Sequence, residues 1–390
     1  MKTFDAIVVG GGPAGSTAAH VLTAGGMSVV VLDRQRFPRV KLCGGWLSPG
    51  VWDELGLSPH DYPGALWQWA RCHVQRAGKR HSVAGSGYFI RRYELDAFLL
   101  ERSGATLRQH PVETFERRDG LWRVDGEFAA PILIGAGGTH CPVARSAFRV
   151  QRTSLVAAQE HEFEAGREAV ASARVGLDGE PELLLHEDWG GYSWNVPKGE
   201  WLNVGTGTSE PRQVRAAWAK ARDFFLRAGH VPSGARAALD AARGHSYFLF
   251  DPAHLRGCER DGVLLVGDAL GLAHPLTAEG ILPGVVSGRL AAQAVLSGEP
   301  ARYREALRHH ELLRDYALVH ALLGAGSALK RRVGDRAARV PVPAAVSRWA
   351  DAAVVRGFAR LFSGQPLPYS GLLGLAWQGA QSLKESVARA

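Results

Sequence analysis

A short apolar strand that leads directly into a glycine-rich turn is the feature that most constrains this fold. Residues 5–9 are apolar and β-prone, the turn GGGPAG follows as Gly10–Gly15, and a helix is expected from about Ala14 to Ala24. The next strand, Ser28–Leu32, ends at Asp33. Such a turn lets backbone N–H groups approach a pyrophosphate, and an acid after the second strand is placed to bind a ribose. The sequence therefore predicts a Rossmann-like βαβ unit that binds a dinucleotide.

A second informative segment, GVLLVGDALGLAHPLTAEGI, lies far along the chain at Gly262–Ile281. It predicts a buried strand, then Gly267-Asp268, a turn rich in Gly and Pro, and a helix from about Gly280 to Leu296. A carboxylate at a strand end can hold a polyhydroxylated chain, and bare backbone donors suit a planar ring. One ligand long enough to touch both segments would be FAD. No second glycine motif follows a strand, so no separate nicotinamide domain is expected.

Length and composition indicate a globular protein with more than one domain. The chain has 390 residues, of which 46% are hydrophobic and 22% charged. The N-terminus runs straight into a strand, and no apolar stretch reaches the ~20 residues that a membrane span needs, so we expect a cytoplasmic protein without a signal peptide. The four cysteines are scattered, which predicts neither a disulfide framework nor a metal site: Cys43, Cys72, Cys141 and Cys258.

The positive charge is concentrated near the C-terminus. The formal net charge is +8, and residues 301–390 carry 14 Lys and Arg against 6 Asp and Glu. Two interpretations stay open: a solvated arginine-rich face, or a peripheral contact with an anionic membrane. An expected helix at Ala344–Phe362 has an apolar stripe that suits either docking on the core or a membrane surface. Basic residues are not interleaved with aromatics, so no nucleic-acid partner is expected.

The order of the predicted elements indicates an α/β fold. We expect a Rossmann-like FAD-binding domain, an inserted antiparallel β-sheet substrate domain and a helical C-terminal region. The FAD-binding domain is expected to be discontinuous, over residues 1–60, 89–150 and 255–300. The β-rich substrate domain would comprise 61–88 and 151–254, and the helical region 301–390.

Several elements are expected inside these ranges. A helix is predicted at Arg92–Arg102, a pair of strands at Leu107–Glu116 and Leu121–Val124, and a buried strand at Pro131–Gly135. Residues 46–88 show little clean periodicity. The insertion predicts longer strands around one helix: Leu155–Phe163, Glu182–His186, Gly191–Pro197, Trp201–Gly207 and the helix Gln213–Ala228.

The motifs together resemble the geranylgeranyl reductase family of FAD-dependent oxidoreductases, within the p-hydroxybenzoate hydroxylase-like flavoprotein superfamily. The resemblance begins with the N-terminal GGGPAGS and continues with DRxxFPRxKxCGGxLSP from Asp33 and RxxLDxxL from Arg92. It continues with YSWNVPK from Tyr192, followed by LNVGTG from Leu202, and ends with the segment GDALGLAHPLTAEGI. The motifs occur in the family's order over roughly residues 1–300, whereas the last 90 residues carry no assigned motif.

The resemblance implies which residues bind the cofactor and the substrate. FAD would contact Gly10, Gly12, Pro13, Ala14, Gly15, Asp33, Arg34, Cys43, Gly44, Gly45, Arg92, Asp268, Pro275, Gly280 and Ile281. Within this set, Asp268 would hold the ribityl chain. The substrate would contact Tyr192, Trp194 and Pro197.

Three side chains are candidates for the proton or charge stabilisation that a reduction needs. They are Cys43, Tyr192 and His274. Each also has a purely structural alternative. Cys43 would be a small packing residue, Tyr192 a wall of a cavity and His274 a hydrogen-bonding residue in a turn.

The chain departs from the family pattern at three positions. Gly137 stands where the superfamily usually has an acid tied to flavin and nicotinamide handling, so direct reduction by NADPH is in question. His274 stands where the family often has Asp, and Ala278 where it has Gly. Because both positions border the expected flavin ring, the substrate could differ from a geranylgeranyl chain.

The leading hypothesis is an enzyme, an FAD-dependent oxidoreductase that reduces C=C bonds of a hydrophobic, isoprenoid-like substrate. The electron donor is open between NAD(P)H and ferredoxin, the latter implying a redox partner protein. The alternative is an FAD-dependent monooxygenase or halogenase acting on an aromatic or polyketide-like secondary metabolite, because YSWNVP from Tyr192 is faintly similar to the halogenase WxWxIP. A flavin-binding electron carrier without substrate turnover is the third hypothesis.

Overall fold

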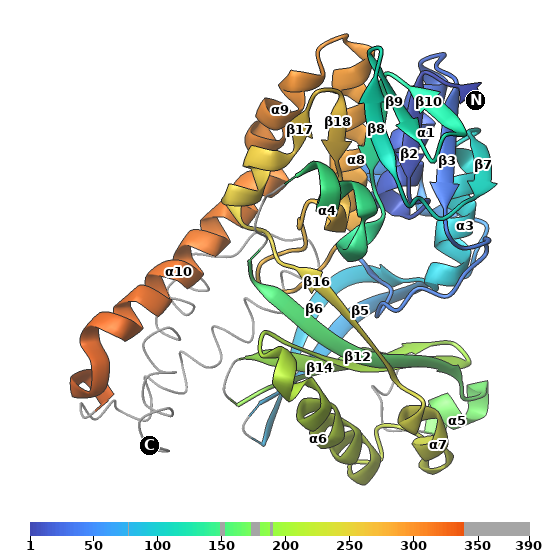
Figure 1. Cartoon of the computed structure of the whole chain (residues 1–390). Helices are drawn as coiled ribbons and strands as arrows, with labels where there is room; N and C mark the ends of the chain where they lie inside the picture. The colour runs from blue at the N-terminus through green and yellow to red at the C-terminus, as the bar shows by residue number, and fades with distance from the viewer. Residues whose placement is uncertain (77, 149–152, 173–179, 188–189, 339–390) are drawn as a thin grey trace.

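The computed structural model describes residues 1–338, apart from residues 77, 149–152, 173–179 and 188–189. A six-stranded sheet lies in the upper half of Figure 1 and an eight-stranded sheet in the lower half, with α6 and α7 beneath the latter. A separate four-stranded sheet covers the N-terminal end. The predicted α/β class, with an inserted β-sheet and a helical region after it, is confirmed by this architecture.

The six-stranded sheet is assembled from short apolar strands. Its order is β17 (Glu259–Arg260), β18 (Val263–Leu265), β11 (Ile132–Gly135), β2 (Ala6–Val9), β3 (Val29–Asp33) and β7 (Thr106–Gln109). Neighbours from β18 to β7 are parallel, and only the edge strand β17 is antiparallel. β2 and β3 are buried along their whole length, as expected for parallel strands covered on both faces.

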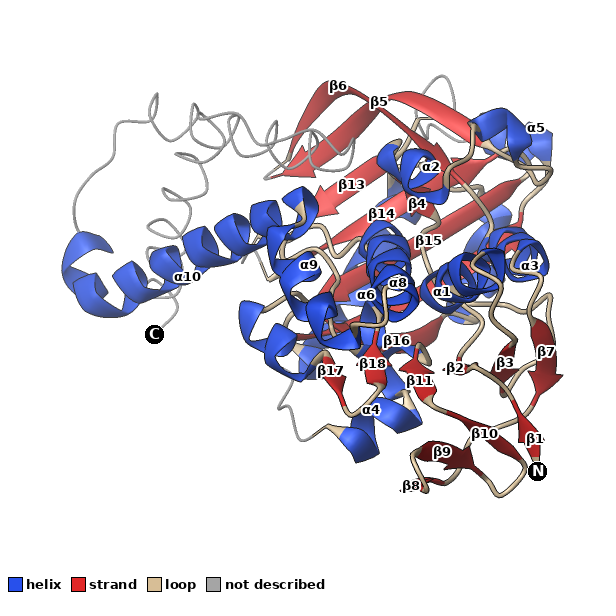
Figure 2. Ribbon diagram, turned by 90° about the horizontal axis from the view of Figure 1, so that it is seen from above, coloured by secondary structure: helices blue, strands red, loops and turns tan. Residues whose placement is uncertain are grey.

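Three helices pack beside this sheet: α1 (Pro13–Ala24), α3 (Arg92–Arg102) and α8 (Ile281–Leu296). Figure 2 shows α1 and α8 side by side. A Cβ added at Gly288 would lie 2.2 Å from the carbonyl oxygen of Ala14, so only glycine permits this approach. Because Gly284 also lies against Ala14, the two helices run together and both begin at the same end of the sheet.

The eight-stranded sheet carries the inserted strands. Its order is β16 (Arg243–Phe248), β12 (Leu155–Glu164), β15 (Trp201–Thr208), β14 (Gly191–Lys198), β13 (Glu182–Leu185), β5 (Trp67–Arg76), β6 (Lys79–Phe89) and β4 (Trp46–Leu47). All pairs are antiparallel except β13 with β5. The strand β4 comes from the 1–60 range that the sequence assigned to the FAD-binding domain.

The two faces of the eight-stranded sheet have different neighbours. Leu202, Val204 and Phe163 point to one face, where they form a core with Trp218 and Phe225 of α6 (Val214–Arg227). Since side chains alternate along a strand, the residues between them face the other way, toward the six-stranded sheet. The shorter helices are α2 (Gly50–Leu55), α4 (Pro142–Ala147), α5 (Arg167–Ser172) and α7 (Arg236–Asp240).

Two sequence expectations about strands are corrected. The predicted pairing of Leu107–Glu116 with Leu121–Val124 is wrong, because the first segment is divided between two sheets. Its beginning forms β7 beside β3, whereas β8 (Phe115–Arg118) pairs with β9 (Leu121–Val124) in the four-stranded sheet. Pro111 lies between the two strands and cannot donate to a ladder. The remaining strands of that sheet are β1 (Lys2–Thr3) and β10 (Phe128–Ala130).

Residues 46–88, which showed little periodicity, contain the long hairpin of β5 and β6. The pairing register shifts between Trp69 and Arg71. An irregularity of this kind adds a residue to one strand and inverts the alternation of its side chains, which conceals the two-residue period.

Two helices follow α8 in the described part of the chain, and their buried residues Tyr303, Leu307, Leu313 and Tyr316 belong to the main core. The two helices are α9 (Tyr303–His309) and α10 (Glu311–Ala338). Tyr303 is fully buried, and its hydroxyl donates a hydrogen bond to the carbonyl oxygen of Leu265 in β18 at 2.9 Å. The expected helix at Ala344–Phe362 lies outside the described residues. Among the helices that the structure describes, none is long and apolar enough to cross a membrane.

Candidate functional site

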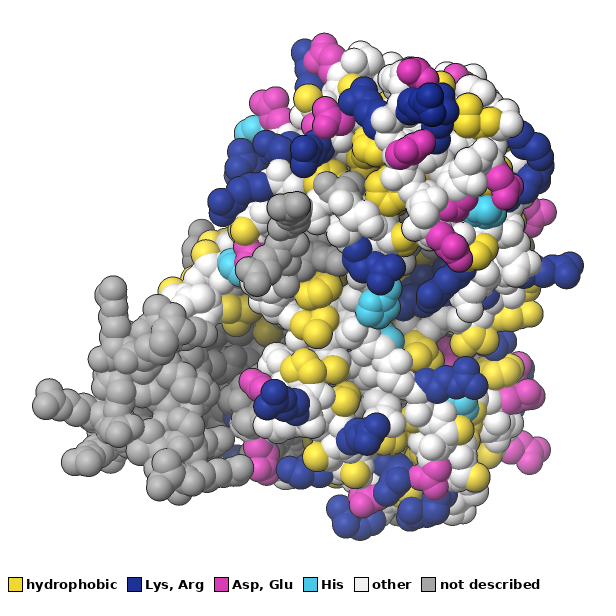
Figure 3. Space-filling view, in the orientation of Figure 1, with side chains coloured by type: hydrophobic (Ala, Val, Ile, Leu, Met, Phe, Trp, Pro, Cys, Tyr) yellow, Lys and Arg dark blue, Asp and Glu magenta, His cyan; other side chains and the backbone are white. Residues whose placement is uncertain are grey.

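A cavity lies where the carboxyl ends of the parallel strands meet the eight-stranded sheet. The residues that follow β2, β3, β11 and β18 all border it, which is the usual ligand position in an open parallel sheet. On the face shown in Figure 3, Lys, Arg and His side chains gather where the two halves of the molecule meet.

Most of the site residues expected from the sequence meet in this cavity. Those that line it are Gly10, Gly12, Pro13, Ala14, Asp33, Arg34, Cys43, Gly44, Gly45, Arg92, Tyr192, Trp194, Asp268, Gly280 and Ile281. Those that do not are Gly15, Pro197, His274 and Pro275. The cavity therefore joins the glycine turn to the segment around Asp268, as a single extended ligand requires.

The glycine turn is held in a conformation that other residues could not adopt. Gly10 has φ +109°, and a Cβ there would lie 2.5 Å from the carbonyl oxygen of Ala136. A Cβ at Gly15 would be 1.9 Å from the carbonyl oxygen of Gly10, so Gly15 closes the turn without bordering the cavity. A Cβ at Gly12 would have an Arg39 nitrogen, at 3.6 Å, as its nearest atom. The space over Gly12 is therefore open for a phosphate group.

Asp33 both shapes the turn and faces the cavity. Its Oδ2 accepts a hydrogen bond from the Gly11 N–H at 2.9 Å, and its Oδ1 accepts one from the Gln35 N–H at 2.9 Å. A carboxylate has about four acceptor sites, so Asp33 can still accept hydrogen bonds from hydroxyl groups of a ligand.

Arg92 is fixed by a buried carboxylate. Its Nε and Nη2 donate to the two oxygens of Asp96 at 2.6 and 2.8 Å, and Asp96 is fully buried. Arg39 reaches the same carboxylate at 3.1 Å. Two guanidinium groups thus share one acid, which leaves net positive charge beside the cavity that suits an anionic ligand.

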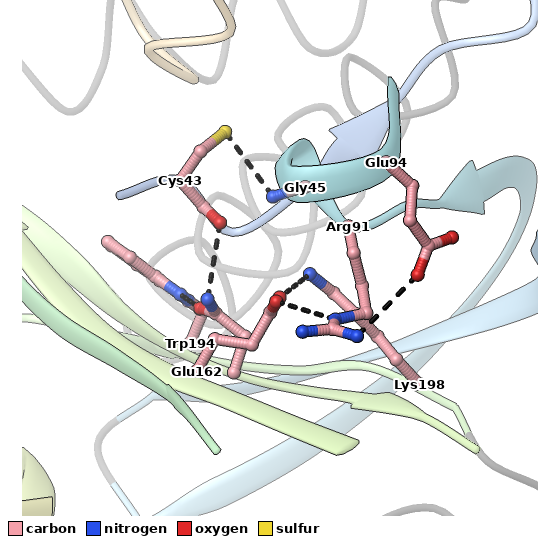
Figure 4. A network of polar contacts seen from close by, with 8 residues as sticks. Cys43, Gly45, Arg91, Glu94, Glu162, Trp194 and Lys198 are labelled. Carbon is pink, nitrogen blue, oxygen red and sulfur yellow. Dashed lines mark hydrogen bonds and ion pairs between the residues drawn. The ribbon is translucent and has the colours of Figure 1, made fainter. Parts of the chain in front are cut away.

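The segment Cys43–Gly45 packs directly against the eight-stranded sheet. The Cys43 Sγ accepts a hydrogen bond from the Gly45 N–H at 3.3 Å, and its carbonyl oxygen accepts one from Asn203 at 3.2 Å. Asn203 in turn accepts from the Trp194 indole N–H at 2.7 Å, as Figure 4 shows. Gly45 has φ +67°, and a Cβ there would lie 2.0 Å from the carbonyl oxygen of Ile90. The segment is therefore held in place through contacts of its backbone with Asn203 and Ile90.

Behind the cavity, an ion-pair network explains the lysine of YSWNVPK. Lys198 is fully buried and donates to Glu162 at 2.6 Å. Arg91 reaches the same carboxylate at 3.0 Å and lies over the Trp201 ring, 3.5 Å from its centroid. Figure 4 shows these groups together beneath Cys43 and Gly45. Lys198 is therefore a structural cation, paired with Glu162 of β12, and does not border the cavity.

The strand β14 presents alternate residues to the cavity. Tyr192, Trp194 and Val196 border it, whereas Pro197 lies one residue out of phase and does not. The Tyr192 hydroxyl donates to the carbonyl oxygen of Thr277 at 2.5 Å, which ties the eight-stranded sheet to the turn before α8. Since its O–H is engaged in this bond, Tyr192 acts as a wall of the cavity.

His274 stabilises the turn and lies away from the cavity. Its Nδ1 accepts hydrogen bonds from the N–H groups of Leu276 and Thr277, both at 3.0 Å, and its ring meets Tyr316 edge-on at 4.6 Å. Burial lowers the pKa of His274 to about 3, so the imidazole is neutral. Of its two expected roles, the geometry matches the hydrogen-bonding one.

Two acidic residues that sequence reasoning missed border the cavity: Glu160 in β12 and Glu279 beside Gly280. Burial raises the pKa of Glu160 to about 8 and that of Glu279 to about 7. His245 and Tyr247 of β16 border the cavity as well. Neither acid carried a sequence signal that set it apart from an ordinary acidic residue.

Comparison with known proteins assigns the chemistry. Residues 3–50 match a family described as an FAD binding domain. The geranylgeranyl diphosphate reductase of Rhodobacter capsulatus is 29% identical over 321 residues, which cover 76% of this chain and 77% of that protein. The chain is an FAD-dependent oxidoreductase that is similar to geranylgeranyl reductases. The resemblance read from its motifs is thereby confirmed.

Solved structures share the fold of this flavoprotein over its whole length. A geranylgeranyl bacteriochlorophyll reductase-like protein of Thermoplasma acidophilum has a TM-score of 0.66 at 19% identity, with 100% of this chain and 99% of that chain covered. The flavin-dependent brominase Bmp2 has a TM-score of 0.65 at 16% identity, with 100% of both chains covered. Reductase-like and halogenating proteins thus use one fold, so the fold alone does not select the reaction.

The cavity of the flavoprotein fits FAD on its own geometry. It runs without interruption from the open space over Gly12 to the carboxylate of Asp268. A Cβ at Gly280 would lie 3.1 Å from Asp268 Oδ1, so glycine keeps the space beside this carboxylate free. Positive charge from Arg92 and Arg39 and the beginnings of α1 and α8 border the same cavity.

Proposed function

We propose that this flavoprotein reduces carbon–carbon double bonds of a hydrophobic isoprenoid substrate. The observation that carries the proposal is the apolar and aromatic wall that the eight-stranded sheet presents to the cavity: Trp46, Leu183, Tyr192, Trp194 and Val196. Such a wall favours a flexible hydrocarbon over a charged or sugar-like substrate. Similarity to a protein named geranylgeranyl diphosphate reductase supports the same substrate class.

We place FAD along the wall opposite this aromatic surface. The N–H groups of Gly10–Gly15 would hold the pyrophosphate, Asp33 the adenosine ribose and Asp268 the ribityl chain. The N-terminus of α8 at Gly280–Ile281 would lie at the isoalloxazine, with Cys43–Gly45 at its other side. When bound and reduced, FAD supplies the hydride that the reduction requires.

The side chains have three tasks in this proposal. The aromatic wall holds the substrate chain and excludes water from it. The hydrogen bond from Tyr192 to Thr277 keeps the wall at a constant distance from the turn before α8. The positive end of α8 favours negative charge on the nearby edge of the cofactor. A proton source is the remaining requirement.

The electron donor and the membrane contact are further parts of the proposal. Because Gly137 carries no acidic side chain, we expect a reduced ferredoxin-like protein to be a better electron donor than NADPH.

For the basic C-terminal region, we propose contact with an anionic membrane surface. Co-sedimentation with anionic vesicles, comparing the full chain with one that ends at Ala338, tests the contact. Equal binding by both chains would contradict it.

One experiment separates the three functional hypotheses. The FAD-loaded protein is reduced with dithionite without oxygen and mixed with geranylgeranyl diphosphate, and the product is examined by mass spectrometry. We expect the mass to rise by two hydrogens for each double bond reduced. If geranylgeranyl diphosphate is not reduced, the protein is supplied with NADPH, oxygen, bromide and an aromatic substrate. A halogenated or hydroxylated product would then favour the halogenase or monooxygenase. FAD that only exchanges electrons with a redox protein would indicate a carrier.

A further inference from the structure

Glu160 occupies an unusual position in the eight-stranded sheet. It lies near the middle of β12, where its partners are Gly205 in β15 and Arg243 in β16. Its side chain is fully buried and borders the cavity together with His245 and Tyr247 of the neighbouring strand. Within the residues that the structure describes, neither carboxyl oxygen of Glu160 has a hydrogen-bond partner. A buried polar group without a partner is costly, which points to a functional reason for its presence.

The charged groups around Glu160 do not neutralise it as an ion pair. Lys198, the charged group that lowers the pKa of Glu160 most, already donates to Glu162 two residues along the same strand. Lys41 and Arg92 also act on Glu160 from across the cavity, and Glu162 opposes them. Arg92 is engaged with Asp96. Burial outweighs these influences and raises the pKa of Glu160 to about 8, so the carboxyl group keeps its proton at neutral pH.

The other acidic groups at the cavity are less suited to donate a proton to a substrate. The O–H of Tyr192 is directed at the carbonyl oxygen of Thr277. The Cys43 sulfur accepts a hydrogen bond from its own turn. Glu279 accepts a hydrogen bond from Ser48 at 2.9 Å and belongs to the same turn as Gly280, the wall where we place FAD. Glu160 comes from the opposite wall.

We propose that Glu160 is the catalytic acid of this oxidoreductase and protonates the substrate carbon that does not receive the hydride. The proposal rests on the proposed function. One alkene carbon receives a hydride, with its two electrons, from reduced FAD, and the other receives the proton of the Glu160 carboxyl group. Two C–H bonds form, while the π bond of the alkene, the N–H bond of reduced FAD that releases the hydride and the Glu160 O–H bond break. Oxidised FAD and a Glu160 carboxylate remain, and the carboxylate regains its proton from water.

The position of Glu160 explains why a separate acid is useful. A substrate held between the two walls would meet the hydride from one side and the proton from the other. Gly205, on the same face of the sheet as Glu160, leaves room for the Trp194 ring, so the carboxyl group lies beside the aromatic wall that would hold the hydrocarbon chain.

The first test compares Glu160→Gln with Glu160→Asp, and with Glu164→Gln as the matched control at the exposed end of the same strand. Each FAD-loaded protein is reduced with dithionite and mixed with geranylgeranyl diphosphate without oxygen, and reoxidation of the flavin is followed by absorbance. We expect Glu160→Gln to bind FAD normally but to reoxidise about 10²–10⁴-fold more slowly. Glu160→Asp should recover part of the rate, and Glu164→Gln should match the wild type. Normal reoxidation by Glu160→Gln would overturn the proposal.

The second test detects the proton itself and needs no turnover. The infrared C=O stretch of protonated carboxyl groups is titrated in the FAD-loaded protein. A band that disappears near pH 8 should be present in the wild type and in Glu164→Gln but absent from Glu160→Gln. Its persistence in Glu160→Gln would overturn the assignment of the proton. If the wild type reduces no isoprenoid alkene, the proposed function fails and the catalytic role of Glu160 fails with it, while this titration still decides whether Glu160 holds a proton.

Discussion

The indole ring of Trp194 lies directly across Gly205 of the neighbouring strand. A Cβ at position 205 would be 2.3 Å from the Trp194 Cζ2 atom and 2.7 Å from the Cβ of Glu160. Two residues further along the strand, a Cβ at Gly207 would lie 3.8 Å from the nearest Trp194 atom, which is ordinary contact. Gly205 of LNVGTG therefore makes room for the tryptophan ring of YSWNVPK, and the two motifs pack against each other.

We expect Gly205→Ala to displace this ring. The added methyl group would clash with the indole and break its hydrogen bond to Asn203, so stability should fall by about 1–3 kcal/mol. Urea unfolding and tryptophan fluorescence measure the effect. Gly244→Ala is the matched control, because a Cβ in that strand would find its nearest atom, the Ala158 carbonyl oxygen, at 3.7 Å. Equal stability of the two variants would contradict the explanation.

Asp268 should be essential for holding the cofactor. Asp268→Asn keeps the shape of the side chain but removes the charge at the end of β18, so we expect the purified protein to lose most of its FAD. The absorbance ratio of flavin to protein measures the occupancy. Asp53→Asn, on the exposed side of α2, should retain the wild-type ratio. A fully loaded Asp268→Asn protein would remove Asp268 from the binding site.

The sequence predicts the elements around the cofactor better than those around the substrate. The turn after β2, the helix α3 and the strand before Asp268 follow simple rules of apolar runs, glycine turns and caps, and the structure has them within one or two residues. The hairpin of β5 and β6 obeys no such rule, because the register shift near Trp69 inverts its alternation. Its partner strand β13 comes from much later in the chain, and local sequence contains no information about that pairing.

For the site, short motifs reveal positions where only glycine fits the backbone, whereas single acidic residues carry no sequence signal of their role. Gly10, Gly45 and Gly205 are recognisable because glycine alone fits their positions. Glu160 and Glu279 look like ordinary acidic residues in the sequence. Their shifted pKa values arise from burial by segments that are distant in the chain, which only the folded structure brings together.

Ala278 is strained in the backbone conformation that it adopts. Its φ is +60°, in the left-handed region where a Cβ costs about 1 kcal/mol and glycine costs less. We therefore expect Ala278→Gly to stabilise the protein by up to about 1 kcal/mol in urea unfolding. Ala241→Gly, at φ −82°, should instead destabilise by a similar amount. Destabilisation by both substitutions would show that Ala278 is not strained.

Tyr303 anchors the C-terminal helices to the six-stranded sheet. Tyr303→Phe removes the buried hydroxyl that donates to Leu265 and should lower stability by about 1 kcal/mol. Thermal unfolding monitored by circular dichroism measures the loss. Tyr93→Phe, at an exposed position, should leave the melting temperature unchanged. A Tyr303→Phe protein as stable as the wild type would show that this hydrogen bond makes no net contribution to the free energy of unfolding.

Stability should pass through a maximum as pH changes, because two sets of buried groups act in opposite directions. Burial lowers the pKa of His274 and His245 from 6.5 to about 3, so the unfolded chain binds more protons in this range and stability is lost as pH falls below about 6.5. Glu160 has its pKa raised from 4.5 to about 8, so the folded state binds more protons there and stability is lost as pH rises through this range. Urea unfolding at several pH values measures both limbs.

Glu160→Gln separates the two limbs of this profile. The amide carries no titrating proton, so the variant should lose part of the decline on the alkaline side while the acidic side stays unchanged. The free energy of unfolding of the variant, relative to that of the wild type, should rise steadily between pH 5 and pH 9, by at least about 1 kcal/mol in total. If the difference in free energy of unfolding between the variant and the wild type does not change with pH, Glu160 has the same pKa in the folded and unfolded states. In that case the carboxyl group would be ionised at neutral pH and could not serve as an acid.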